Sequence, residues 1–332
     1  MGGRGVRLFQ HGDHRLRLSV PLGIALPDGL PLRDAVEICV EAERLGYSDV
    51  WSYEVAGHDA FTPLAAIAAR TERLRLGTAV VPASTRPPAL LAMTSAALQN
   101  LSGGRFCLGL GTSTTTIVNR WMGLPTRIGL DHMRRTIQAI RAIAAGDKVN
   151  GFRLEAGASP LPIYVGALGL RMVELAGEIA DGLILTTVTP AHVRVMVDRF
   201  SRSGLDVVLT VPVVLDEPDA REVVRESLAA YGVIDVYNRH LVRQGFEEEA
   251  RQLREAWARR AWKDAVQAVS DWMLESMAII GDLGECRKQI ARYQEAGVTT
   301  LLLAPVTRVT EAKARKARIL DDLARLVSIS GR

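Results

Sequence analysis

Residues 54–59, which read EVAGHD, hold an unusual density of proton-transfer side chains for a loop at a strand end. Carboxylates and imidazoles of this kind serve in general acid and base catalysis, and histidine does so near neutral pH. A structural interpretation is also open: Asp59 would cap the helix that begins near Phe61, and His58 would merely be exposed. Glu54 and His58 are therefore the candidate catalytic residues, and either could carry the proton.

A second stretch, FCLGLGTSTTT at 106–116, combines glycines with a run of hydroxyl side chains. A dinucleotide-binding loop requires a third glycine, where this chain has Thr114, and an acidic residue about twenty positions further on at the end of a second strand. That position instead falls in DHMRRT, inside a predicted helix. We expect Gly109 and Gly111 to leave open space at a strand end. The hydroxyls at 112–114 would then bind the polar edge of a cofactor or satisfy the backbone of a turn.

A third candidate is the start of a helix after the apolar segment PIYVGA at 162–167. Gly169 and Arg171 fall in its first turn, where free N–H groups, the helix dipole and an arginine together form an anion site. Glycine is common in such turns, so this pattern alone is a weak indication.

Residues 77–82, GTAVVP, carry no ionisable side chain, and their composition alone predicts plain core. The chain contains no HExxH, GxSxG, P-loop or Ser/His/Asp arrangement. Few groups for hydrolysis and a largely uncharged pocket indicate a bound organic cofactor that performs the difficult chemistry.

These candidates lie at the ends of short apolar segments that are typical of strands. The eight predicted strands span 18–26, 49–53, 74–81, 105–111, 162–167, 182–187, 206–215 and 299–305. The amphipathic segments between them span 32–46, 62–74, 88–101, 133–146, 172–180 and 191–204. Strands that alternate with helices predict an α/β fold with a parallel sheet, and eight such units predict a closed (β/α)8 TIM barrel. Catalytic residues of such barrels lie at the C-terminal ends of the strands.

Residues 18–332 are expected to form this single barrel domain, after a flexible leader at 1–17 that lacks the apolar core of a secretory signal. The segments 112–160 and 216–284 are too long for simple connections. We expect insertions at the C-terminal face, with residues 216–284 largely helical. The three tryptophans of that insertion are expected to pack helix against helix or to shape a pocket or a subunit contact.

The composition excludes several classes of protein. Of the 332 residues, 48% are apolar, which is enough for a large core and excludes a disordered chain. A net charge of +4 spread over the length does not indicate nucleic-acid binding. No apolar run is long enough to span a membrane. Cys39, Cys107 and Cys286 have no metal-ligand spacing and are expected to be buried free thiols. We therefore expect a cytoplasmic protein with no metal.

The same residues carry a resemblance to a known family. The sequence resembles the bacterial luciferase-like superfamily and, within it, the oxidoreductases that use coenzyme F420, a deazaflavin hydride carrier. The resemblance extends over residues 42–112, 162–185 and 281–305, in the order and spacing of that family. It implies a TIM barrel, F420 as cofactor, a small-molecule substrate and a homodimer.

The resemblance also assigns roles to residues. In that family the ring packs on a bulge with a non-proline cis peptide, which here would be Ala79-Val80, so the interpretation of this segment as plain core is replaced. Gly111 and Thr112 are implied to line the ring pocket, and Glu54 matches an acidic residue near the reactive carbon. The residues implied to bind the tail phosphate of the cofactor are Gly169, Leu170, Arg171 and Met172.

Two departures from the family pattern matter for the reaction. Val55 stands where many deazaflavin-dependent members have histidine, so His58, in the stretch HDAF, is the alternative proton carrier. Thr114 stands where sugar-phosphate-oxidising members carry glutamate, which argues against that substrate. We expect an F420-dependent oxidoreductase. The alternatives are an FMN-dependent luciferase-like monooxygenase, a non-catalytic flavin-binding paralogue, or a cofactor-free barrel enzyme that acts on a phosphorylated metabolite.

Overall fold

Short runs rich in valine, leucine and isoleucine form the strands of the structure, a computed structural model that describes residues 21–124, 129–155, 160–200, 204 and 206–330. Runs that are apolar on both faces suit parallel strands covered by helices. The strands are β1 (Leu22–Ala25), β2 (Asp49–Ser52), β3 (Arg75–Thr78), β4 (Val81–Pro82), β5 (Phe106–Gly111), β6 (Ile163–Gly166), β7 (Gly182–Thr186), β8 (Asp206–Leu215), β9 (Ile279–Gly281) and β10 (Thr300–Pro305).

The sheet closes on itself because β10 pairs in parallel with both β1 and β8. Leu22 is opposite Leu301 on one side of β10, and Thr300 is opposite Val208 on the other. The predicted (β/α)8 barrel is confirmed, with each predicted strand overlapping one of its eight strands. The predicted strand at 74–81 is divided into β3 and the start of β4, and the short strand β9 was not predicted. Strands β4 and β9 extend the sheet beside the ends of β5 and β8.

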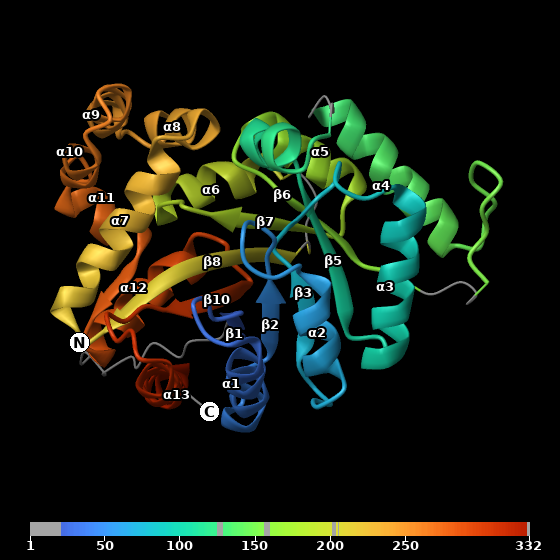
Figure 1. Cartoon of the computed structure of the whole chain (residues 1–332), viewed down its shortest axis with the longest axis horizontal. Coiled ribbons are helices and arrows are strands. Elements are labelled where there is room, and N and C mark those ends of the chain that lie inside the picture. The colour runs from blue at the N-terminus through green and yellow to red at the C-terminus, as the bar shows by residue number, and fades with distance from the viewer. Residues whose placement is uncertain (1–20, 125–128, 156–159, 201–203, 205, 331–332) are drawn as a thin grey trace, which may run out of the picture.

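Helices surround the strands on the outside of the barrel (Figure 1). Helix α4 has this position because Met133, Ile137 and Ile140 recur at helical spacing and are buried on one face. The helices are α1 (Leu32–Leu45), α2 (Phe61–Ala68), α3 (Pro88–Ser102), α4 (Leu130–Ala144), α5 (Leu170–Ile179), α6 (Pro190–Arg199), α7 (Arg221–Gly232), α8 (Asp235–Val242), α9 (Glu247–Ala258), α10 (Trp262–Gln267), α11 (Asp271–Met277), α12 (Leu283–Glu295) and α13 (Ala312–Val327). A π-helix at Thr116–Trp121 was not predicted.

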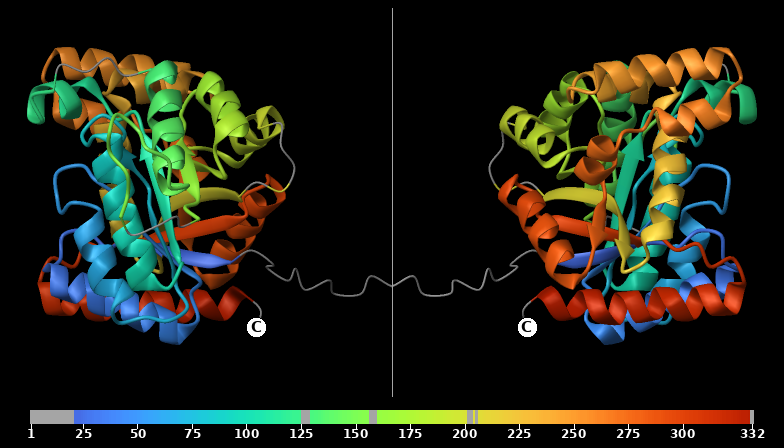
Figure 2. Two further views of the ribbon diagram at one scale, coloured as in Figure 1. Left: turned by 90° about the vertical axis from the view of Figure 1, so that its right-hand side faces the viewer. Right: turned by 90° about the vertical axis from the view of Figure 1, so that its left-hand side faces the viewer.

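Helices α7–α11 follow the C-terminal end of β8 and have a hydrophobic cluster of their own, which includes Phe246 and Leu253. Helices α8–α10 lie at the opposite end of the molecule from α1 and α13 (Figures 1 and 2), whereas the segment just before α7 pairs with α13 through Asp216 and Arg325. The segment between α9 and α11 is broken by Arg260, whose φ of 57° is left-handed, and by Ser270, which caps α11.

The tryptophans of these helices are on the surface. Their exposed fractions are 56% for Trp257, 41% for Trp262 and 58% for Trp272. The expectation that they pack helix against helix is therefore wrong for most of their surface, although the ring of Trp272 contacts that of Phe246 at a centroid distance of 4.4 Å.

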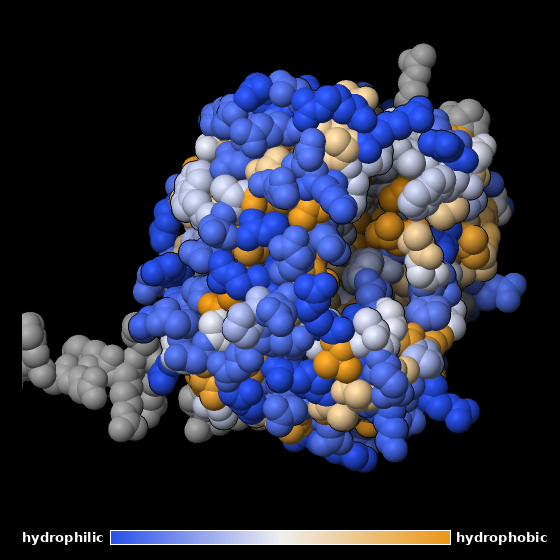
Figure 3. All heavy atoms as spheres, turned by 60° about the vertical axis from the view of Figure 1, so that its left-hand side comes forward, coloured by the Kyte–Doolittle hydropathy of each residue, from blue (hydrophilic) through white to orange (hydrophobic). Residues whose placement is uncertain are grey.

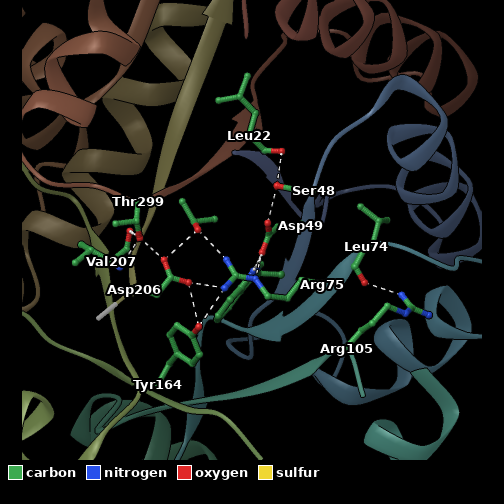
Figure 4. A network of polar contacts seen from close by, with 12 residues as sticks. Leu22, Ser48, Asp49, Leu74, Arg75, Arg105, Tyr164, Asp206, Val207 and Thr299 are labelled. Carbon is green, nitrogen blue, oxygen red and sulfur yellow. Dashed lines mark hydrogen bonds and ion pairs between the residues drawn. The ribbon is translucent and has the colours of Figure 1, made fainter. Parts of the chain in front are cut away.

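A polar network ties the strands together at the N-terminal end of the barrel (Figure 4). Arg75, the first residue of β3, donates to Asp49 at 2.5 Å and to Thr300 at 2.7 Å, and it also pairs with Asp206. Burial alone would raise the pKa of Asp206, but the Arg75 guanidinium and neighbouring hydrogen bonds hold that pKa below its ordinary value. This end of a TIM barrel serves stability, which leaves the opposite end for chemistry.

Three further observations bear on the expected class of protein. Cys39, Cys107 and Cys286 are buried and free, as predicted. Among the residues that the structure describes, no helix combines the length and the apolar character that crossing a membrane requires. Within the same residues, no cluster of three or more His, Cys, Asp and Glu side chains could hold a metal ion.

Candidate functional site at the C-terminal end of the barrel

The chain forms a bulge between β3 and β4, and the peptide bond of Ala79-Val80 within it is cis, as the resemblance implied. The bulge is held on the side of β2, because the Ala79 N–H donates to the Ser52 carbonyl at 2.6 Å and the Glu54 N–H donates to the Val80 carbonyl at 3.3 Å. Ala79 and Val80 are half-buried and pack on the apolar cluster inside the barrel. The bulge therefore forms an apolar cover over the barrel interior.

The glycines of β5 and β6 receive this bulge. A Cβ on Gly109 would lie 1.7 Å from the Thr78 carbonyl oxygen, and a Cβ on Gly111 would lie 2.4 Å from Cγ2 of Val80. Gly166 faces Cγ1 of Val80 in the same way, at 2.9 Å. The expectation that Gly109 and Gly111 leave open space for a ring is therefore wrong, because Thr78 and Val80 fill that space.

The acidic candidate of the site, Glu54, is paired with an arginine. Its carboxylate accepts two hydrogen bonds from Arg86, at 2.6 and 2.7 Å, and the side chains are 9% and 21% exposed respectively. The hydrogen bond to Glu54 raises the pKa of the Arg86 guanidinium, which also lies 5.1 Å above the ring of Phe61. Two-point pairing of this kind fixes the orientation of the carboxylate as well as its position.

Sequence reasoning missed Arg86. A signal was present, because Arg86 is the one charged residue between Arg75 and Arg105 and stands four positions after the bulge segment 77–82. A lone charge in an apolar stretch beside a strand end needs a partner when it is partly buried. The nearest unassigned carboxylate at the neighbouring strand end is that of Glu54.

The structure separates the roles of His58 and Asp59. Asp59 accepts hydrogen bonds from the N–H groups of Phe61 and Thr62, both at 3.0 Å, so it caps α2 as the structural interpretation proposed. Burial would raise the pKa of Asp59, but these hydrogen bonds lower it overall. His58 is exposed and makes no hydrogen bond within the described part of the chain. Arg86 thus makes the hydrogen-bonded contact with Glu54 here, and His58 does not.

The hydroxyl run after β5 has mixed roles. The Thr114 hydroxyl accepts a hydrogen bond from the Ile117 N–H at 3.3 Å and so serves the first turn of the π-helix. Ser113 adopts a left-handed φ of 58°, and Thr112 is half-buried beside Gly111. Backbone satisfaction accounts for Thr114, and the side chain of Thr112 remains the candidate for ligand contact.

The turn after β6 is the candidate anion site. Gly169 precedes α5 in an extended conformation, and no side chain caps the helix there. The space where a Cβ of residue 169 would lie is open, with no atom within 4 Å. The N–H groups of Met172 and Val173 donate to the Gly169 carbonyl, at 3.0 and 3.2 Å, so the N–H groups of Leu170 and Arg171 are the ones that can bind an anion here. Arg171 is exposed in this turn, and Leu170 and Met172 are half-buried.

The surface is hollowed on the side of the molecule that carries the insertion helices. Figure 3 brings the left-hand side of Figure 1 forward and shows a recess in a mostly hydrophilic face, with hydrophobic side chains along part of its wall.

Comparisons with known proteins identify the family and the fold. A family model described as luciferase-like monooxygenase matches residues 14–300. The chain is 30% identical to Rv3520c of Mycobacterium tuberculosis, a candidate coenzyme F420-dependent oxidoreductase, over 90% of this chain and 95% of that protein. It is 27% identical to 5,10-methylenetetrahydromethanopterin reductase of Methanolobus tindarius, over 83% of this chain and 91% of the relative. A solved F420-dependent secondary alcohol dehydrogenase shares the fold, with a TM-score of 0.75 at 16% identity, over 94% of this chain and 99% of that one.

Proposed function

The chain belongs to the luciferase-like monooxygenase family of oxidoreductases, and we propose that it uses coenzyme F420 to exchange a hydride with a small organic substrate. The observation that carries the proposal is the position of Glu54. Its backbone N–H donates to the Val80 carbonyl of the bulge, and its carboxylate is oriented by Arg86. An ionisable group is thereby held next to the apolar surface on which a flat ring would lie.

The described residues fit a coenzyme of this type at both of its ends. The bulge at Ala79 and Val80 offers a partly exposed apolar surface for a ring, with Thr112 at its edge. The uncapped turn at Gly169 has open space for a phosphate, and the exposed Arg171 adds a positive charge there. We assign ring contact to Ala79, Val80 and Thr112, with Gly111 supporting Val80 from behind, and tail contact to Gly169, Leu170, Arg171 and Met172.

The coenzyme, when bound, supplies or accepts the hydride. The residues of the chain orient it and manage the proton. Glu54 takes a proton from the substrate hydroxyl during oxidation, or returns it during reduction, and the two hydrogen bonds from Arg86 keep the carboxylate aimed in one direction. The apolar bulge would keep water away from a ring bound on it, which limits side reactions of the reduced coenzyme.

The decisive experiment is anaerobic titration calorimetry of the purified protein with F420 and, separately, with FMN. Turnover is then followed by deazaflavin absorbance with a panel of secondary alcohols, and with ketones and reduced-pterin-type substrates in the opposite direction. We expect F420 to bind more tightly than FMN and turnover to be independent of oxygen.

Other outcomes identify the alternatives. Tight FMN binding with oxygen-dependent turnover would identify a monooxygenase. Binding of a flavin without any turnover, unchanged in a Glu54 and His58 double variant, would identify a non-catalytic paralogue. Phosphate protection without any change in deazaflavin absorbance would identify a cofactor-free enzyme that acts on a phosphorylated metabolite.

A further inference from the structure

Two residues at the C-terminal end of α8 contact the turns that follow β6 and β7. They are His240, in the last turn of the helix, and Gln244, just beyond its end. The turn after β6 leads into α5 at Gly169, and its first residue is bound to strand β7, because the Ala167 N–H donates to the Ile184 carbonyl at 3.1 Å. A part of the insertion thus reaches the turn to which the proposed function assigns the anion.

Gln244 fastens the turn after β7 at two points. Its amide donates to the Thr187 carbonyl at 3.1 Å and accepts from the Thr189 N–H at 2.8 Å. Thr187 has a left-handed φ of 51°, which a residue without glycine's freedom keeps only where its surroundings impose it. The side chain of Gln244 therefore determines where this turn lies.

His240 is completely buried, and neither of its ring nitrogens makes a hydrogen bond of normal geometry within the described residues. Its nearest polar neighbours include the carbonyls of Leu168 and Thr187, which come from the two turns. The ring also packs edge-on against the buried His192 of α6, at a centroid distance of 5.4 Å. The buried imidazole thus faces backbone carbonyls of both turns.

We propose that His240 and Gln244 are positioning residues for the anion site at Gly169. By holding the turns after β6 and β7 in one arrangement, they preorganise the N–H groups that would receive the phosphate-bearing tail of the coenzyme. The inference rests on the proposed function, and it adds that the insertion helix α8, and not the barrel alone, sets the affinity for the tail. Neither residue touches the reacting atoms.

The test compares two ligands with the full-length protein. One is F420, and the other is the deazaflavin chromophore without its phosphate-bearing tail. Each dissociation constant is measured by calorimetry for the wild type, Gln244→Met, His240→Phe and His240→Gln. We expect Gln244→Met to weaken F420 binding by about tenfold, as the loss of a hydrogen bond would, and His240→Phe to weaken it as well, because the larger apolar ring displaces the turns that pack on it. Neither variant should change binding of the tail-less chromophore by more than about twofold. His240→Gln, which keeps a polar N–H group, should bind F420 more tightly than His240→Phe does.

The matched control is Arg239→Ala, which removes an exposed side chain from the same helix and should leave both constants unchanged. Circular dichroism melting shows which variants are folded. If His240→Phe does not fold, Gln244→Met, whose side chain is half-buried, carries the test. Equal weakening of both ligands, or no weakening of either in a folded Gln244→Met, would overturn the positioning role while the proposed function stands. A wild-type protein that binds both ligands equally would refute the anion site itself.

Discussion

The carboxylate of Glu54 and the guanidinium of Arg86 meet through two hydrogen bonds, of 2.6 and 2.7 Å, across 32 positions of sequence. The pair joins the end of β2 to the segment before α3, and the bulge at Ala79-Val80 lies between them in sequence. This arrangement gives the site a charged side chain with one defined orientation. Several measurable consequences follow from it and from the contacts around it.

Replacing Glu54 with glutamine should lower kcat by about 100-fold or more, because the amide cannot accept the proton that the reaction releases. The dissociation constant for the coenzyme should change little, since the shape of the side chain is kept. Steady-state kinetics and calorimetry measure the two quantities. The matched variant is His58→Asn, which we expect to retain most activity. If His58→Asn lost as much activity as Glu54→Gln, the proton would have to be assigned to His58.

Replacing Arg86 with lysine should lower kcat by about tenfold, and Arg86→Met should lower it further. Lysine keeps the charge but cannot make the two parallel hydrogen bonds to Glu54. The ratio of kcat values for the two variants, measured with saturating coenzyme, separates charge from geometry. Equal losses in both variants would show that orientation is the property that matters, and full activity in both would remove Arg86 from the site.

Gly111→Ala should destabilise the protein by about 1 to 3 kcal/mol, because its Cβ would lie 2.4 Å from Cγ2 of Val80. Val80→Ala removes that atom and should relieve the clash, so the double variant should lose less than the sum of the single variants. Urea unfolding of all four proteins gives the interaction energy. Strict additivity would contradict the contact between Val80 and Gly111.

The stability should fall in mild acid because His240 is buried in its neutral form. Burial lowers the pKa of His240 to about 3, assisted by His192 and Arg243, from an ordinary value of 6.5. The unfolded chain therefore binds a proton below about pH 6.5 that the folded chain refuses until about pH 3, and the contribution to stability is complete only above that window. At pH 5 the loss is about 2 kcal/mol. The free energy of unfolding, measured with urea between pH 5 and 8, should depend less on pH in His240→Phe than in the wild type. An equal pH dependence in both proteins would contradict a buried neutral His240.

Arg75→Met should cost about 3 kcal/mol or more, because it leaves Asp49 and Asp206 without their shared cation at a largely buried position. Activity per folded molecule should be kept, since the network lies at the end of the barrel away from Glu54. Arg44→Met is the control, because the pair of Arg44 with Glu41 is exposed and should contribute less than about 1 kcal/mol. Melting temperatures and kcat of the folded fraction measure both effects. If Arg75→Met lost activity without losing stability, the assignment of a purely structural role to the Arg75 network would be wrong.

The periodicity of the sequence was sufficient to predict the barrel. In strands such as β8, apolar residues occupy consecutive positions. In helices such as α4, apolar residues recur every three or four positions, so the sequence pattern distinguishes strands from helices. Strand β9 was not predicted, because three residues are too few to show a periodicity in the sequence. The separation of β4 from β3 was not predicted either, because it depends on the bulge at Ala79-Val80. The break in the long helical stretch also escaped, since it depends on the left-handed backbone of Arg260.

The site was predictable only where a role depends on nearby residues. The cap formed by Asp59 involves neighbours two and three positions away, and it was foreseen as an alternative. The partner of Glu54 is distant in sequence, and the lone charge of Arg86 in an apolar stretch was the only signal for it. The atoms that fill the space at Gly109 and Gly111 come from Thr78 and Val80, about 30 positions away, so no local pattern specifies them. The resemblance placed the cis bond at Ala79-Val80, which composition alone assigned to plain core.

The closure of the barrel has a consequence for the nascent chain. Leu22 in β1 pairs with Leu301 in β10, and the Arg75 side chain reaches Thr300 across 225 positions. A chain that leaves the ribosome from its N-terminus exposes one edge of β1 until β10 has been made. Contacts of such long range form slowly and leave strand edges exposed meanwhile. Synthesis of β10 therefore controls when the barrel closes. A truncation before residue 300 would leave the edges of β1 and β8 unpaired and prone to aggregation.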